Sequence, residues 1–235
     1  ETRTDYIAAS GLYMQNWYTA NGFNSKQIEI VGAPQFDGLY DDNLPSRSEA
    51  RDVLHLAQAD LVLCYASTWG QTTSIRGDAE REIDDGLAAA LKLAQMLNAT
   101  LIIKVHPNDA QPIDQYYAKA LQMAKLNGLV TRWHSNYILR AADAVIAQGP
   151  SNFCIDAAIL GTPSCYIQTE GFDFVNEWNL PYRGSNDMLK IMVETALNSK
   201  DDPHWQDFIG YYNAAHPIGN ANERALNYIR SVCHA

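Results

Sequence analysis

The stretch Ala141–Gln168 constrains the fold most, because it reads as strand, turn, helix and strand in succession. Residues 144–147 are uniformly apolar, as in a strand that is buried on both faces. A turn signal, Gln148-Gly149-Pro150, follows this run. Ser151 can then cap a helix that Gly161 ends, and a second apolar run completes the stretch. The pattern predicts a βαβ unit.

The helix that begins at Ser151 opens directly after a strand. Such a helix presents free backbone N–H groups and the positive end of its dipole at one point. A terminus of this kind binds anions, and phosphate above all. The segment is therefore a candidate phosphate site, and the alternative is an ordinary βαβ unit that binds no ligand.

Apolar strands and amphipathic helices alternate from residue 60 to residue 200. Alternation of this kind predicts an α/β fold, a Rossmann-like doubly wound parallel sheet with helices on both faces. The expected strands end near Tyr65, Val105, Trp133, Ala147 and Ile167. In such sheets ligands bind outside the carboxyl ends of the strands. We therefore expect the polar residues after these ends to share one cleft: Ser67, Thr68, His106, Arg132, His134 and Ser151.

The charge and the cysteines exclude several classes of protein. A formal net charge of −10 and the lack of a basic cluster argue against a non-specific nucleic-acid binder. None of the 4 cysteines forms a Cys-x-x-Cys pair, so neither a zinc knuckle nor a disulfide framework is expected. Reduced cysteines favour a cytoplasmic protein, and we see no signal peptide and no apolar run long enough to span a bilayer. The chain begins with Glu1, so we expect a fragment of a longer protein.

Four short motifs, taken in order, resemble a known group of transferases. They are Val31–Asp37, Tyr65–Trp69 (Tyr-Ala-Ser-Thr-Trp), Lys104–Pro107 (Lys-Val-His-Pro), and Ser151–Asp156 followed by Leu160–Pro163. The last three resemble the C-terminal, donor-binding domains of GT-B glycosyltransferases, most of all the group of CDP-glycerol glycerophosphotransferases and capsule-polysaccharide transferases, and Val31–Asp37 resembles the segment that joins the two halves of such enzymes. The chain is similar also to the non-hydrolysing UDP-N-acetylglucosamine 2-epimerases. It departs from the group at Ser67, where proline is frequent, and at Asn152, where a second serine is frequent.

The resemblance implies a metal-independent transferase domain that takes a nucleotide-activated sugar or alditol and serves polysaccharide or glycoconjugate synthesis. Residues 1–45 would be a βαβ remnant and linker from a preceding domain. Residues 46–235 would be a Rossmann-like nucleotide-sugar-binding domain with C-terminal helices. The implied partners are the donor, a sugar or glycan acceptor and an N-terminal GT-B domain, without which we expect no activity. No cofactor, metal or nucleic acid is expected, and association with the inner membrane face is left open.

The resemblance also implies roles at the predicted cleft. His106 would donate a hydrogen bond to the phosphate of the nucleotide donor or protonate the leaving group. The alternative is a structural role, in which the imidazole is buried and makes its hydrogen bonds within the protein. Ser151 and Asn152 would bind the phosphate, and the alternative for Ser151 is a plain helix cap. Asp156, a charge on a largely apolar helix, would accept a ribose hydroxyl.

The remaining candidates flank those residues. Arg132, Trp133 and His134 would hold the nucleotide base, although Trp133 fits a core position equally well. Ser67 and Thr68 would line the wall near the transferred group. Two further functions stay open, a UDP-sugar 2-epimerase and a non-catalytic module that binds a nucleotide or sugar. The base, cytidine or uridine, is not decided.

Overall fold

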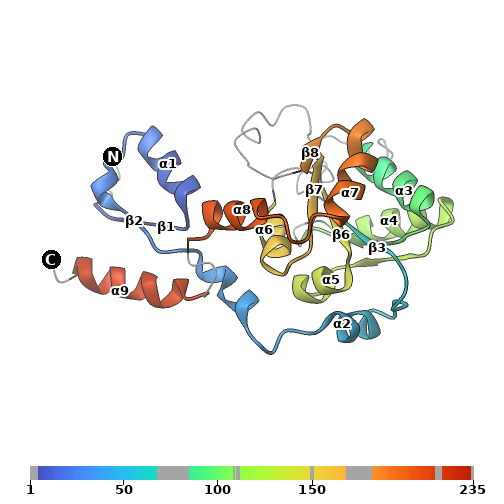
Figure 1. Ribbon diagram of the computed structural model, residues 1–235, viewed down its shortest axis with the longest axis horizontal. Helices are drawn as coiled ribbons and strands as arrows, with labels where there is room; N and C mark the ends of the chain where they lie inside the picture. Colours follow the sequence, from blue (N-terminus) through green and yellow to red (C-terminus); the bar gives the residue numbers. More distant parts are fainter. Residues whose placement is uncertain are drawn as a thin grey trace. The chain divides into compact units, whose positions relative to one another are not determined.

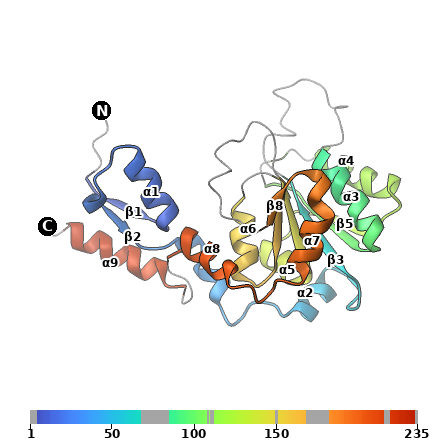
Figure 2. The same ribbon diagram turned by 45° about the horizontal axis from the view of Figure 1, so that its top comes forward.

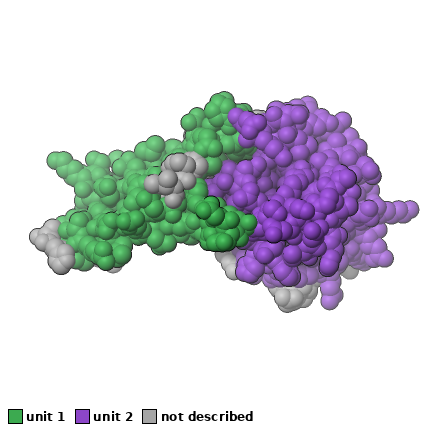
Figure 3. Space-filling view, turned by 60° about the horizontal axis from the view of Figure 1, so that its bottom comes forward, with its two compact units in different colours: residues 1–44, 202–235 green, residues 45–201 purple. Residues whose placement is uncertain are grey.

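The computed structural model describes residues 5–67, 85–107, 109, 112–148, 151–167, 182–214 and 219–233. The chain divides into two compact units, residues 1–44 with 202–235 and residues 45–201 (Figure 3). The C-terminal helices, which the sequence analysis assigned to the second domain, therefore group with the first 44 residues. The division into domains itself stays a prediction.

The larger unit contains a six-stranded sheet in which every pair of neighbours is parallel. Its strands are β3 (Val62–Ala66), β4 (Thr100–Lys104), β5 (Gly128–Thr131), β6 (Ala144–Gln148), β7 (Ser164–Ile167) and β8 (Tyr182–Gly184). Their order is β5-β4-β3-β6-β7-β8, so the chain winds outward from β3 to β5 and then crosses to the other side of β3. This reversal between β3 and β6 is where open α/β sheets bind ligands.

Helices cover both faces of this sheet (Figures 1 and 2). One face packs against α3 (Asp85–Leu97), α4 (Pro112–Met123) and α7 (Leu189–Leu197), whose buried side chains form one apolar cluster with alternate strand residues. Two helices, α5 (Ser135–Ala141) and α6 (Asn152–Ile159), contact the sheet at β3, β6 and β7, and α2 (Arg47–Val53) packs on α5. The predicted α/β, doubly wound parallel sheet is therefore confirmed.

A buried arginine joins α2 to the sheet. Arg51 is fully buried, and its guanidinium donates to the carbonyls of Ala141, Ala57, Gln58 and Asp60. It also donates to the Asp143 carboxylate at 3.0 Å, which accepts from the Val62 backbone N–H as well. Because every contact replaces water that the guanidinium loses, this charge can lie in the interior.

The smaller unit is built on the two-stranded parallel sheet of β1 (Ile7–Ala9) and β2 (Ile28–Ile30). Around it lie α1 (Leu12–Ala20), η2 (Pro34–Tyr40), α8 (His204–Tyr212) and α9 (Ala221–Cys233), with α8 against α1 and α9 against η2. The Asp37 carboxylate accepts from the backbone N–H groups of Ala221 and Asn222 and so caps α9. Among the helices described here, none combines the length and apolar character needed to cross a membrane.

Candidate functional site

Polar residues that follow β3, β4 and β5 meet at the carboxyl edge of the sheet. The register pairs Ala66 with Lys104 and Lys104 with Thr131, so the three strands end side by side. The backbone N–H of His106 donates to the Ser67 hydroxyl at 2.9 Å. The Arg132 guanidinium donates to the carbonyl of His106 at 3.3 Å. Ser67, His106 and Arg132 therefore form one hydrogen-bonded rim, as expected from the strand order.

Ser67 holds the turn that carries His106. Its hydroxyl lies 3.3 Å from the carbonyl of Lys104 and 3.4 Å from the carboxylate of Asp109, and these acceptors share its proton. Asp109 is buried, and its backbone N–H donates to the carbonyl of His106. Sequence reasoning did not single out Asp109, and the only available signal was its place three residues after His106.

The imidazole of His106 is half-buried at this rim. Burial lowers its pKa, because the charged form loses hydration, and Lys104 lowers the pKa further. The carboxylate of Asp109 opposes both effects. Near neutral pH the ring is therefore uncharged, and one of its nitrogens can donate a hydrogen bond to an anion.

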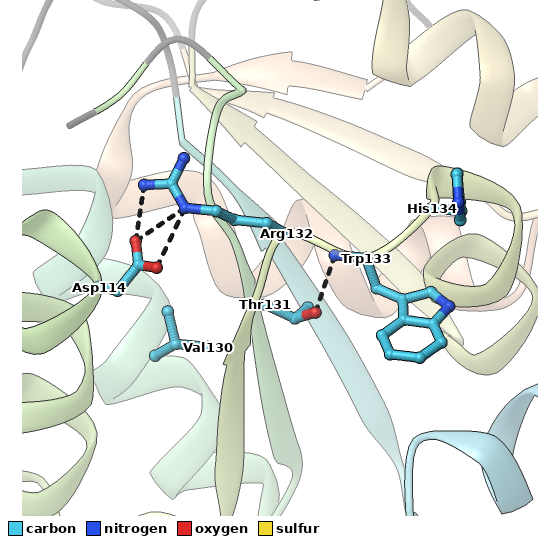
Figure 4. Close-up of a pocket in the computed structure, with 6 residues that line it drawn as sticks. All are labelled: Asp114, Val130, Thr131, Arg132, Trp133 and His134. Atoms are coloured by element: carbon cyan, nitrogen blue, oxygen red, sulfur yellow. Dashed lines mark hydrogen bonds and ion pairs between the residues drawn. The ribbon is translucent and has the colours of Figure 1, made fainter. Parts of the chain in front are cut away.

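Arg132 is oriented by an acidic partner on α4 (Figure 4). Its Nε and Nη2 atoms donate to the Asp114 carboxylate at distances of 2.7–3.1 Å, as a bidentate pair. These hydrogen bonds raise the pKa of Arg132, because they favour the charged form. The guanidinium thus has a defined direction before any ligand arrives.

An open hollow lies beside this ion pair (Figure 4). It has a volume of about 480 Å³ and is lined by Asp114, Val130, Thr131, Arg132, Trp133 and His134. Trp133 is 50% exposed, so the alternative that placed it in the core is wrong. Its ring centroid lies 6.4 Å from that of Tyr137, edge to face, which leaves indole surface open to solvent. A planar base can stack on such a surface.

The helix α6 supplies the other expected contacts. Ser151 is its N-cap, and the hydroxyl of Ser151 accepts from the Phe153 N–H at 3.2 Å. Asn152 is exposed at the first helical position. Asp156 lies one turn further, and among the described residues none donates a hydrogen bond to its carboxylate. Burial alone raises the pKa of Asp156 to about 7.

The predicted residues thus fall into two groups along the same edge. Ser67, His106 and Arg132 are joined by hydrogen bonds, and Trp133 and His134 share the hollow with Arg132. The three candidates on α6 follow β6, which pairs with β3, but no hydrogen bond links them to the first group within the described residues. Thr68 and the turn residues 149–150 lie outside the described residues.

Metal ligation receives no support from the described part of the chain. No three or more His, Cys, Asp or Glu side chains in this part are grouped so that they could hold a metal ion. The expectation that the reaction needs no metal stays a prediction.

A comparison with protein families found one match. Residues 1–149 match the sequence model of the family described as CDP-glycerol:poly(glycerophosphate) glycerophosphotransferase. A comparison with curated proteins found no match.

Solved structures with the same fold include enzymes of two kinds. The wall teichoic acid polymerase TagF is 18% identical, with a TM-score of 0.59 over 98% of this chain and 57% of that chain. The UDP-GlcNAc 2-epimerase of Neisseria meningitidis, bound to UDP-GlcNAc, is 14% identical, with a TM-score of 0.64 over 97% of this chain and 62% of that chain. The UDP-GlcNAc 2-epimerase of Methanocaldococcus jannaschii, in complex with UDP-GlcNAc and UDP, is 14% identical. Its TM-score is 0.65 over 96% of this chain and 61% of that chain. The chain therefore spans about 57–62% of the length of these proteins.

Proposed function

Because the chain belongs to the CDP-glycerol:poly(glycerophosphate) glycerophosphotransferase family, we propose that residues 45–201 bind the nucleotide-activated donor of a polymer-forming transferase. The observation that carries this proposal is the rim of Ser67, His106 and Arg132, with the half-exposed indole of Trp133 beside it. The rim lies at the carboxyl edge of a doubly wound sheet, where such folds bind nucleotides.

The base and the phosphate would occupy different parts of this edge. The hollow at the end of β5 offers the face of Trp133 to a base, with His134 beside it. The phosphate would lie nearer the reversal between β3 and β6, within reach of His106 and of the N-terminus of α6. Asp156, one turn along α6, would accept a ribose hydroxyl.

The proposed chemistry is a displacement that releases a nucleotide. With CDP-glycerol, an acceptor hydroxyl attacks the phosphorus that bears glycerol, the bond from that phosphorus to the CMP oxygen breaks, and CMP leaves with the electron pair. With a nucleotide sugar the attack is at the anomeric carbon, and a nucleoside diphosphate leaves. In both cases the leaving phosphate gains negative charge, which preorganised donors stabilise in the transition state.

His106 suits this step because its imidazole is uncharged in the free protein. A neutral ring donates one N–H to a phosphate oxygen, and the negative charge of the bound phosphate raises the pKa of the ring. We propose no metal in this step. The base that accepts the proton of the acceptor hydroxyl would come from an N-terminal domain, without which the chain would bind donor but not turn it over.

A second candidate function is a UDP-sugar 2-epimerase. The observation that favours it is the likeness in fold to two such enzymes, with TM-scores of 0.64 and 0.65. The family match favours the transferase, because it rests on the sequence of residues 1–149 and not on fold alone. A module that binds a nucleotide and performs no chemistry is the third candidate.

Calorimetric titration without metal tests the donor site directly. The purified chain would be titrated with CMP, CDP, UMP and UDP, together with His106→Ala and Ser151→Ala. His204→Ala is the matched control, because it removes an exposed imidazole from the other unit. We expect one nucleotide family to bind, with affinity reduced in both site variants and unchanged in the control. Nucleotide affinity that neither site substitution changes would contradict the proposed site. Turnover of a CDP-alditol by the full-length protein would distinguish the transferase from the other candidate functions.

A further inference from the structure

A buried lysine at the end of β4 has no counter-ion among the residues that the structure describes. Lys104 is the last residue of β4 and is only 8% exposed. Within the described residues its ammonium makes one hydrogen bond, at 3.5 Å, to the carbonyl of its neighbour Val105. No described carboxylate forms an ion pair with it, although the chain carries a formal net charge of −10. An ammonium that has lost its hydration is costly unless an anion compensates it.

The described residues around Lys104 do not supply that compensation. Burial lowers the pKa of Lys104, and the nearby guanidinium of Arg132 lowers it further, while Cys64 acts in the opposite direction. The acidic groups at this edge are already engaged, because Asp114 binds Arg132 and Asp109 lies against the hydroxyl of Ser67. The described acidic groups at this edge therefore leave the positive charge of Lys104 uncompensated.

The strand alternation places the lysine side chain on one face of the sheet. Ile103 belongs to the apolar cluster under α3, α4 and α7, so Lys104 points to the opposite face, which α5 and α6 cover. The register places Lys104, Ala66, Ala147 and Tyr166 in one row across β4, β3, β6 and β7. The two residues between the lysine and the tyrosine are thus alanines, which have the smallest side chains after glycine.

Tyr166, at the far side of this row, carries a second uncompensated polar group. The residue is 2% exposed, and its buried hydroxyl has no hydrogen-bond partner among the residues that the structure describes. The thiol of Cys154 lies close enough to Tyr166 and to Cys64 to affect the pKa of each. Because Cys154 belongs to the first turn of α6, this turn lies over the row.

We propose that Lys104 and Tyr166 hold the phosphate of the nucleotide donor beneath the first turn of α6, an inference that rests on the proposed donor site. Three strand spacings of about 4.8 Å separate the two residues, so their side chains can reach one phosphate between them. The ammonium supplies positive charge and the hydroxyl a hydrogen bond. The backbone N–H of Asn152, the first residue of α6, supplies a further donor at the N-terminus of this helix.

Titration of the whole chain with CDP and UDP, and with cytidine and uridine, tests this role. Lys104→Met keeps an unbranched side chain, one heavy atom shorter, and removes its charge. We expect it to weaken binding of the nucleoside diphosphate by about tenfold to a hundredfold and to leave the nucleoside unaffected. The ligand-free variant should melt at the same temperature as the wild type or higher, because a buried unpaired charge is gone. Tyr166→Phe should weaken binding of the nucleoside diphosphate by about threefold to tenfold.

Lys92→Met is the matched control, because it changes the net charge equally at an exposed position of α3. It should leave both affinities unchanged. If Lys104→Met does not fold, Lys104→Gln provides the same comparison with a polar side chain. If a folded Lys104 variant binds the nucleoside diphosphate as tightly as the wild type, this inference is overturned and the proposed donor site is not. Failure of the folded wild-type chain to bind any of the four ligands would overturn the proposed donor site and this inference with it.

Discussion

Replacement of Asp156 by asparagine should make the chain more stable and its nucleotide binding weaker. The carboxyl lies on α6 beside the buried residues Cys154 and Ala157, and no described residue donates a hydrogen bond to it. Burial therefore raises the pKa of Asp156 from 3.8 to about 7. A difference of about three pKa units corresponds to roughly 4 kcal/mol. Because the side chain is partly exposed, we expect about half of this, roughly 2 kcal/mol, in a measurement.

The pH at which this cost arises follows from the direction of the shift. Between the unfolded and the folded pKa, the folded chain keeps a proton that the unfolded chain has lost. The free energy of unfolding therefore falls as the pH rises from about 4 to about 7, and this contribution is constant above that range. Asp156→Asn removes the fall. The variant should resemble the wild type near pH 4 and exceed its stability by about 2 kcal/mol at pH 8.

Urea unfolding followed by circular dichroism at several pH values between 4 and 8 measures this difference. Asp187→Asn is the control, because it removes an exposed carboxylate from the same unit. A difference between Asp156→Asn and the wild type that does not change with pH would refute the reasoning. Titration with the nucleotide that the wild type binds should show lower affinity in the same variant, since a neutral amide is a weaker acceptor for a ribose hydroxyl than a carboxylate.

Three further substitutions test other parts of the larger unit. Ser151→Ala should cost about 1 kcal/mol of unfolding free energy in urea, because the Phe153 N–H loses its cap, whereas Ser151→Gly should cost only a few tenths. Trp133→Ala should weaken nucleoside binding by about fivefold or more in calorimetry and change stability by less than about 0.5 kcal/mol, because the indole is half exposed. Arg51→Met should lower the free energy of unfolding by about 3 kcal/mol or more, since it removes the guanidinium donor of several carbonyls and one of the donors to Asp143. An Arg51→Met chain as stable as the wild type would show that the network is dispensable.

The site illustrates what strand order alone can predict. Parallel strands of one sheet end at the same edge, so residues that follow β3, β4 and β5 had to lie close together. The structure joins Ser67, His106 and Arg132 by hydrogen bonds, in agreement with this expectation. It also shows that the Ser67 hydroxyl is occupied in fixing the turn of His106, a role that depends on side-chain geometry and that no spacing in the sequence encodes.

The sequence by itself determined the alternation of strands and helices, and with it the doubly wound sheet, because apolar periodicity is a local property of the chain. It also placed the candidate residues at one edge. Only the tertiary structure decided how each of them is surrounded. Trp133 is exposed, and Lys104 is buried without a counter-ion in the described part of the chain, although the hydrophobicity of each side chain favours the opposite placement. Burial and pairing depend on neighbours that are distant in the chain, and these neighbours are assembled only when the sheet and its helices pack.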